Sequence, residues 1–187
     1  MDYIVAGLGN PGKKYEKTRH NAGFMALDFI AKKLDVKVES EKFKALCGVG
    51  EIAGCKTLFL KPQTFMNLSG FSVLAAMTFY KVKPENTLLI FDDAALPVGT
   101  VRVRKSGTHG GQNGVKNIFE LCGTDNFPRI KIGIGNKPNS DWDLADWVLS
   151  SFSTEEQKIL GDMFENVYSA AELIIRGEAD EAMDKYN

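Results

Sequence analysis

The chain has 187 residues, a net charge of −1 at pH 7 and 44% hydrophobic residues. These values favour one domain, residues 1–187, and argue against a protein that binds nucleic acid through its overall charge. The three cysteines form no CxxC pair, which argues against a disulfide framework or a zinc knuckle. No signal peptide or membrane span is recognisable, so we expect a soluble cytoplasmic protein.

Strands and helices alternate in the first half of the chain. Residues 3–9 form an apolar run that ends in glycines, as a first strand does, and residues 22–34 have the apolar spacing of a helix. Residues 42–60 predict two strands with a turn at Ala53-Gly54. Residues 69–80 predict a second helix, which ends before Pro84.

The second half continues the alternation. TLLIFDDAALP predicts a buried strand that ends in two carboxylates, and residues 101–105 and 129–135 alternate as one-faced strands do. VKNIFELCG predicts a short helix between them, residues 153–156 match a capping box that opens a helix to about 176, and a short acidic helix follows. The sequence therefore predicts a single-domain α/β fold with a central twisted mixed β-sheet flanked by helices.

One of the two histidines, His20, lies directly before the first helix. Such a residue is either catalytic or a surface or capping histidine. Asp92 and Asp93 end the buried strand, at the edge where α/β sheets gather their sites, and a carboxylate there can orient a histidine. The alternative is a solvated strand end. No histidines have chelating spacing, so the sequence predicts no metal site.

Two glycine-rich segments suit close approach to a ligand. Gly7–Gly12 matches GxGxxG, but no helical pattern follows its third glycine, so we interpret it as a tight turn that presents Asn10 rather than as a nucleotide site. Residues 107–114, GTHGGQNG, form either a ligand-binding loop or a mobile one. Asn113, next to Gly114, can also be an ordinary turn residue.

Basic residues recur on two predicted strands. Alternation places Arg102 and Arg104 on one face of a strand, and Arg129 and Lys131 on one face of another. If these strands are neighbours, four cations share a surface suited to phosphate. The alternative is the polar face of a half-buried sheet.

The motifs GLGNPG, TRHNAGF, KPQTFMNLSG, FDDAALPVG, GTHGGQNG and FPRIKIGIG, taken in this order, resemble the bacterial peptidyl-tRNA hydrolase family over essentially the whole chain. The resemblance implies cleavage of the ester that links a peptide to the 3′-terminal ribose of tRNA. It also implies a monomer without a cofactor, with peptidyl-tRNA as its partner.

Residue by residue, the resemblance implies that His20 is the general base that activates water. Asp92 pairs with His20 and sets its tautomer. Asn10 and Asn67 position substrate and water.

The same resemblance implies further contacts to the substrate. Met66 lines the peptide groove, Tyr15 binds substrate, and Asn113 holds the peptide backbone or the ribose. Arg104 and Lys131 clamp the 5′-phosphate of tRNA, with Lys131 acting as a point charge.

The chain departs from the family pattern at Ala95, where an aspartate is usual, and at Gln112, where a histidine is usual. These departures concern tRNA contacts and loop order, and the implied catalytic residues are all present. Two alternatives stay open: a non-catalytic RNA-binding protein on the same fold, and a nucleotide-dependent enzyme that uses GLGNPG.

Overall fold

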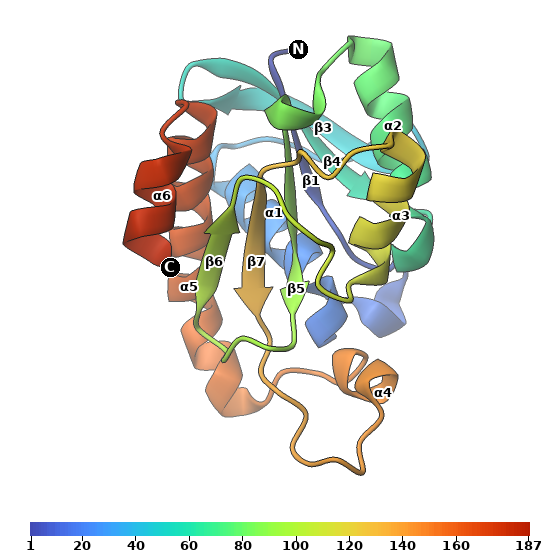
Figure 1. Cartoon of the computed structure of the whole chain (residues 1–187), viewed down its shortest axis with the longest axis vertical. Helices are drawn as coiled ribbons and strands as arrows, with labels where there is room; N and C mark the ends of the chain where they lie inside the picture. The colour runs from blue at the N-terminus through green and yellow to red at the C-terminus, as the bar shows by residue number, and fades with distance from the viewer.

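A seven-stranded mixed β-sheet forms the centre of the computed structural model, which describes all 187 residues (Figure 1). In spatial order the strands are β2 (Ser40–Lys42), β3 (Ala45–Ile52), β4 (Cys55–Pro62), β1 (Tyr3–Gly7), β5 (Thr87–Asp93), β7 (Arg129–Gly133) and β6 (Val101–Arg104). Strands β4, β1, β5 and β7 run parallel, and the pairs β2–β3, β3–β4 and β6–β7 are antiparallel. The predicted α/β fold with a mixed sheet is confirmed.

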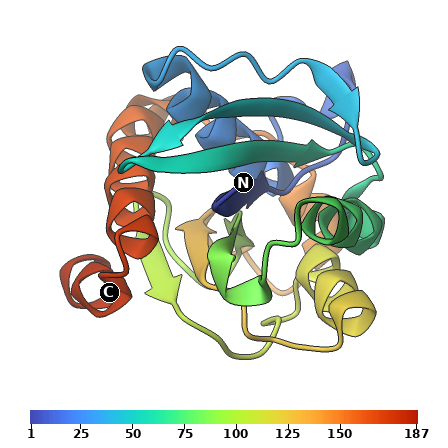
Figure 2. The same ribbon diagram turned by 90° about the horizontal axis from the view of Figure 1, so that it is seen from above.

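Helices cover both faces of the sheet, with α5 and α6 on one side of the molecule and α2 and α3 on the other (Figures 1 and 2). The helices are α1 (Ala22–Lys33), α2 (Ser69–Tyr80), α3 (Asn113–Cys122), α4 (Leu144–Val148), α5 (Thr154–Ile175) and α6 (Ala179–Tyr186). Short 3-10 helices are η1 (Lys13–Tyr15), η2 (Arg19–Asn21), η3 (Met66–Leu68) and η4 (Pro84–Asn86). None of the helices combines the length and the apolar character needed to span a bilayer.

The interior strand β5 is buried on both faces. Leu88 and Ile90 pack in the core beneath α1, α5 and α6, whereas Leu89 and Phe91 pack in the core beneath α2 and α3. A strand covered on both sides has no polar face, which explains its continuous apolar run. The apolar run of the strand stops at Asp92, so this carboxylate lies at the C-terminal end of β5.

A glycine brings the first helix close to the ends of the central strands. A Cβ atom at Gly23 would lie 2.3 Å from the carbonyl oxygen of Ile90 and 2.6 Å from that of Leu8, closer than any real Cβ contact. Only glycine fits this approach. The result is that η2, immediately before α1, lies beside the end of β5 and carries His20 to Asp92.

The structure differs from the sequence prediction in three helical or strand segments. Helix α3 begins at Asn113 rather than Val115, because the Gln112 side chain caps it and so includes Gly114 in the first turn. The strand β2 is exposed and polar, with no apolar pattern to reveal it. Helix α4 has five residues, too few for a periodic pattern, and is capped by Asp143.

A buried arginine connects the segment before His20 to the C-terminal half of the chain. Arg19 is 4% exposed. It donates two hydrogen bonds to the Glu156 carboxylate, at 3.0 and 2.8 Å, and one to the carbonyl of Ile134. Its guanidinium lies 3.9 Å from the centre of the Trp147 ring. These contacts hold His20 in place relative to α4 and α5.

Replacing Glu156 with glutamine tests this connection, because glutamine still completes the capping box with Ser153. We expect the free energy of unfolding at pH 7 to fall by about 1.5–3 kcal/mol, the usual range for hydrogen bonds to charged groups. Burial acts to raise the pKa of Glu156, but the hydrogen bonds and charge of Arg19 and the bonds from Ser153 lower it below its ordinary 4.5. The stabilisation is therefore present above pH 4.5 and is lost as the pH falls through the lower folded-state pKa.

Urea unfolding at pH 7 and at pH 3 measures this difference, which should shrink at the lower pH. The control is Glu155→Gln, which removes an exposed ion pair with Lys158 and should change the free energy of unfolding by less than about 0.5 kcal/mol. A Glu156→Gln protein as stable as the native chain at pH 7 would contradict the prediction.

Candidate active site

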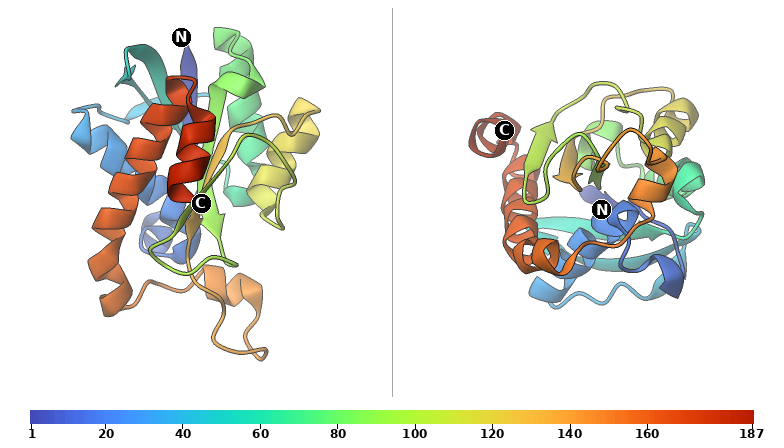
Figure 3. Two further views of the ribbon diagram at one scale, coloured as in Figure 1. Left: turned by 60° about the vertical axis from the view of Figure 1, so that its left-hand side comes forward. Right: turned by 90° about the horizontal axis from the view of Figure 1, so that it is seen from below.

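A cavity of about 410 Å³ lies at the C-terminal ends of β5 and β7, and residues of α4 line part of it. Helix α4 lies beyond the ends of these strands (Figures 1 and 3). Sites in α/β sheets form at this edge, because the loops that follow parallel strands meet there. The cavity brings together seven of the sequence-predicted residues: Asn10, His20, Met66, Asn67, Asp92, Asn113 and Lys131.

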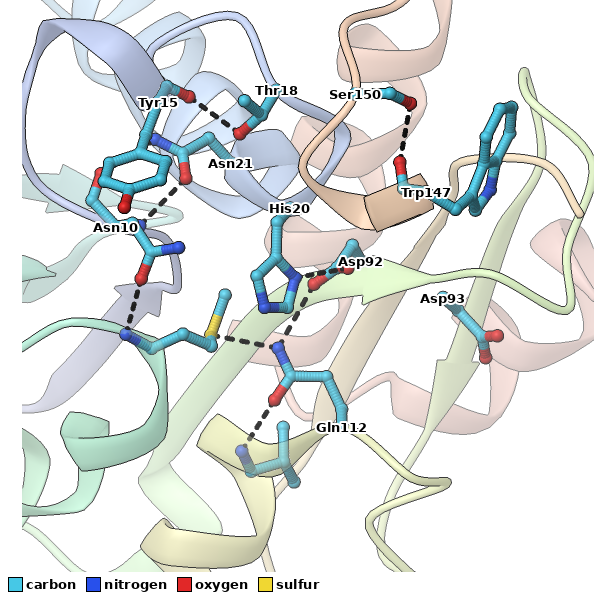
Figure 4. A network of polar contacts seen from close by, with 12 residues as sticks. Asn10, Tyr15, Thr18, His20, Asn21, Asp92, Asp93, Gln112, Trp147 and Ser150 are labelled. Atoms are coloured by element: carbon cyan, nitrogen blue, oxygen red, sulfur yellow. Dashed lines mark hydrogen bonds and ion pairs between the residues drawn. The ribbon is translucent and has the colours of Figure 1, made fainter. Parts of the chain in front are cut away.

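His20 and Asp92 form a hydrogen-bonded pair at the base of this cavity. His20 Nδ1 lies 2.7 Å from Asp92 Oδ2, and the two side chains are 16% and 3% exposed (Figure 4). A carboxylate only accepts hydrogen bonds, so Nδ1 carries the proton and Nε2 carries the free lone pair. The geometry therefore makes Nε2 the basic atom of the cavity.

The environment of His20 places its pKa above the ordinary 6.5. Burial acts to lower the pKa, but the negative charge of Asp92 and the hydrogen bond to it raise the pKa by more. The imidazolium form is thus stabilised by its partner, as a general base needs once it has taken a proton.

Asn10 occupies the turn after β1 and is held on both sides. Its Oδ1 accepts a hydrogen bond from the backbone N–H of Met66 at 2.7 Å. The Asn21 amide pairs with its backbone, accepting from Asn10 N at 2.8 Å and donating to Asn10 O at 2.9 Å. With Oδ1 engaged, Nδ2 is the end that points toward the side of the cavity where His20 lies (Figure 4). Asn10 can therefore present a hydrogen-bond donor.

Asn21 has a structural role that no sequence pattern predicted, although it stands next to His20 in the motif TRHNAGF. By pairing with the Asn10 backbone it connects the two loops that carry the predicted catalytic residues. An asparagine beside a candidate base is the only sequence signal for this.

Of the predicted substrate residues, two line the rim of the cavity and two lie outside it. Asn67, in η3, and Asn113, at the start of α3, are exposed at the rim. Tyr15 lies outside the cavity and packs edge-on against Phe65, with ring centroids 6.3 Å apart, and Phe65 itself lines the cavity. Arg104 also lies outside the lining, on the edge strand β6.

The predicted set of four cations is corrected by the structure. Strands β6 and β7 are neighbours, and Arg102 faces Lys131 while Arg104 faces Arg129, so the four residues share a face of the sheet as expected. Arg129, however, is only 1% exposed. The expectation that it contributes to an anion-binding surface is wrong, because the glycine-rich loop covers it.

Arg129 instead binds the loops around it. Its guanidinium donates to the carbonyl oxygens of Gly107, Thr108, Asp125 and Phe127 at 2.6 to 3.0 Å. Burial lowers its pKa to about 10, against the charge of Asp125, so it remains a cation at pH 7. The signal that could have revealed this role is weak: an arginine on a strand between two apolar residues.

Lys131 remains partly exposed and lines the cavity. Its Nζ lies 3.5 Å from Asp93 Oδ2, and the two side chains are 17% and 19% exposed. Asp93 also accepts a hydrogen bond from Ala95 N, which orients it at the strand end. The ammonium group of Lys131 thus lies at the edge of the cavity, with the Asp93 carboxylate beside it.

Apolar side chains from α4 and from the residue after it cover part of the cavity, and no sequence pattern predicted them. Leu144, Val148 and Leu149 line it, and Leu144 and Leu149 are 50% and 43% exposed. The cavity therefore has a polar base, formed by His20 and Asp92, and an apolar cover.

Gln112, which stands where the family resemblance leads one to expect histidine, is a buried member of the site. It is 8% exposed and donates through Nε2 to Asp92 Oδ1 at 3.1 Å (Figure 4). The sequence signal for it was only its place between the glycines and Asn113.

Comparison with known proteins identifies the family of the chain. A family model described as peptidyl-tRNA hydrolase matches residues 4–187. The chain belongs to the peptidyl-tRNA hydrolase family. The family predicted from the motifs is therefore confirmed, and its members are hydrolases.

Individual relatives match over almost their whole length. The chain is 50% identical over 186 residues to a peptidyl-tRNA hydrolase of Agathobacter rectalis, covering 99% of this chain and 100% of that one. It is 49% identical over 185 residues to one of Alkaliphilus oremlandii, covering 99% of each. The crystal structure of the peptidyl-tRNA hydrolase of Acinetobacter baumannii superposes with a TM-score of 0.92 at 34% identity, covering 99% of this chain and 94% of that one.

The corrected role of Arg129 predicts a loss of stability in Arg129→Lys. A single ammonium group cannot serve four carbonyl oxygens, and each buried polar group left unpaired costs about 1–3 kcal/mol. We expect the free energy of unfolding, measured with urea, to fall by about 3 kcal/mol. The matched control is Arg102→Lys on the neighbouring strand, where the change should be within about 0.5 kcal/mol. Equal losses in the two variants would count against the role.

Proposed function

We propose that this protein hydrolyses the ester that joins a peptide to the 3′-terminal ribose of tRNA and so returns the tRNA to translation. Membership of the peptidyl-tRNA hydrolase family supports this substrate. The observation that carries the mechanism is the 2.7 Å contact between His20 Nδ1 and Asp92 Oδ2, which leaves Nε2 as the base of an open cavity.

In the proposed reaction, His20 Nε2 removes a proton from a water molecule while the water oxygen attacks the ester carbonyl. Asp92 stabilises the imidazolium that forms. The intermediate carries a negative oxygen, for which Asn10 Nδ2 and the backbone amides of the glycine-rich loop are candidate donors. His20 then returns its proton to the ribose oxygen as the carbon–oxygen bond breaks, releasing the peptide acid and tRNA.

The two ends of the substrate are assigned to different parts of the surface. Met66, Asn67, Asn113 and Tyr15 are proposed to bind the peptide and its ribose end. Arg104 and Lys131 are proposed to bind the 5′-phosphate of tRNA. Phosphate contacts orient a nucleic acid without reading its sequence, so this arrangement would accept many tRNAs.

The proposal needs no cofactor, because His20 and Asp92 account for each proton transfer. One copy of the chain carries every proposed site residue. We therefore propose a monomeric enzyme that acts in the cytoplasm, where peptidyl-tRNA arises.

Release of N-acetyl-aminoacyl product from N-acetyl-aminoacyl-tRNA, measured with EDTA present, tests the function. The native chain should turn over the substrate, and His20→Ala should lower kcat by roughly 100-fold or more, the scale of general-base catalysis. The control is His109→Ala, which removes the other imidazole from the same cavity and should cost less than about tenfold. A native chain that binds tRNA without releasing product would identify a non-catalytic RNA-binding protein.

The phosphate contact predicts a salt effect that Lys131→Ala should reduce. We expect KM to rise with little change in kcat, because the contact is made equally in the ground and transition states. The slope of log(kcat/KM) against log[salt] should decrease in magnitude by roughly one unit, the share of one phosphate contact. The matched control is Lys158→Ala, an exposed and ion-paired lysine on α5. A salt dependence identical in all three proteins would rule out the contact.

A further inference from the structure

Gln112 joins the cap of a helix to the carboxylate of the catalytic pair. Its Oε1 accepts a hydrogen bond from the backbone N–H of Val115 at 2.9 Å, which caps α3. Because a backbone N–H only donates, this contact determines which end of the amide is oxygen. The Nε2 group must then face the opposite way, toward Asp92.

The two protons of that amide nitrogen have separate acceptors. One points to Asp92 Oδ1 at 3.1 Å, and the other to the sulfur of Met66 at 3.0 Å. The amide oxygen and both N–H groups of Gln112 therefore have partners within the protein, and the residue is 8% exposed. Figure 4 shows Gln112 on the side of Asp92 away from α4. A side chain held at three points offers a fixed donor.

Asp92 is in turn held by both of its oxygens. Oδ2 contacts His20 Nδ1 at 2.7 Å, and Oδ1 accepts from Gln112. Rotation of the carboxylate about its χ2 angle would break one of these contacts. Because Asp92 is only 4% exposed, bulk water cannot readily replace a hydrogen-bond partner that it loses.

We propose that Gln112 is a positioning residue for the hydrolytic reaction: by donating to Asp92 Oδ1 it holds the carboxylate in the orientation that keeps Oδ2 on His20 Nδ1. This inference rests on the proposed function for its kinetic readout, but its geometric part concerns the free protein. It also gives a reason why this chain functions with glutamine at position 112.

The donor is neutral, which matters for how the pair titrates. The other titratable side chains that line the cavity are Asp93, Lys131 and His109. Asp93 and Lys131 pair with each other, and His109 Nδ1 accepts from Gly111 N, so each has a partner other than Asp92. The segments contributed by η3 and α4 bring no titratable group to the lining. Gln112 therefore anchors Asp92 without adding a second ionisation to it.

Removing the anchor has a predictable effect on His20. Burial acts to lower the pKa of His20, and its contact with Asp92 outweighs this effect. If Asp92 turns away, burial dominates and the pKa falls. The acidic limb of kcat/KM should then move to lower pH while kcat decreases, because the base is weaker and its protonated form is less stabilised.

Two substitutions separate this role from simple helix capping. Gln112→Ser keeps a good N-cap oxygen but is too short to reach Asp92, whereas Gln112→Ala removes both contacts. Serine should thus keep a melting temperature about 2–4 °C above that of the alanine variant. Both should lose about tenfold in kcat with little change in KM, as expected when one hydrogen bond to a buried charged group is lost.

The titration of the histidine ring in the free protein gives a readout independent of turnover. With only His20 and His109 in the chain, their NMR signals are readily distinguished by the variant His20→Ala. In Gln112→Ser and Gln112→Ala the pKa of His20 should fall, in the same direction as we expect for Asp92→Asn, which removes the partner's charge altogether. The NMR signals of His109 serve as the internal control.

The inference is overturned if Gln112→Ser has native kcat and a native His20 titration while Gln112→Ala alone is impaired, since Gln112 would then serve only the helix. Should Gln112→Ser fail to fold, Gln112→Thr keeps the same cap and repeats the test. A native chain that does not hydrolyse the ester refutes the proposed function, but the ring titration still decides whether Gln112 holds Asp92.

Discussion

The carboxylate of Asp92 is a negative charge that is almost fully buried at the end of the interior strand β5, and the candidate active site is organised around it. A buried charge is costly unless it is paired and hydrogen-bonded. His20 provides a partner from η2, and Gln112 provides a neutral donor from the cap of α3. Three segments far apart in the sequence therefore meet at one carboxylate, and the contact that pairs its charge with His20 also leaves Nε2 of His20 free toward the cavity.

Two buried arginines support this arrangement from outside the cavity. Arg19 connects the histidine segment to the start of α5 through Glu156, and Arg129 holds the glycine-rich loop through backbone carbonyls. In each case a planar guanidinium with several donors serves acceptors from more than one loop. Loops lack the regular hydrogen bonds of helices and strands, so these side chains supply the rigidity that a precise site requires.

Much of the fold was predictable because the responsible signals are local. Apolar periodicity located α1, α2 and α5, and continuous apolar residues located β5, since each pattern follows from which faces are buried. Polar edge segments and very short helices carry no such pattern, so β2 and α4 were missed. Whether β6 and β7 are neighbours could not be predicted, because their pairing joins residues far apart in the sequence. The shared face of their basic residues could therefore be predicted only on the condition that they are neighbours.

The sequence by itself determined the chemical inventory: a histidine before the first helix, a carboxylate at the end of a buried strand, asparagines in the flanking loops and a set of cations. Its motifs also determined the family, because they occur in the chain in the order that resembles that family. Only the tertiary structure decided which of these groups touch. It placed Gln112 on Asp92 and buried Arg129 among carbonyl oxygens. The physical reason is that hydrogen-bond partners and burial depend on contacts between segments far apart in the chain, and local patterns do not encode such contacts.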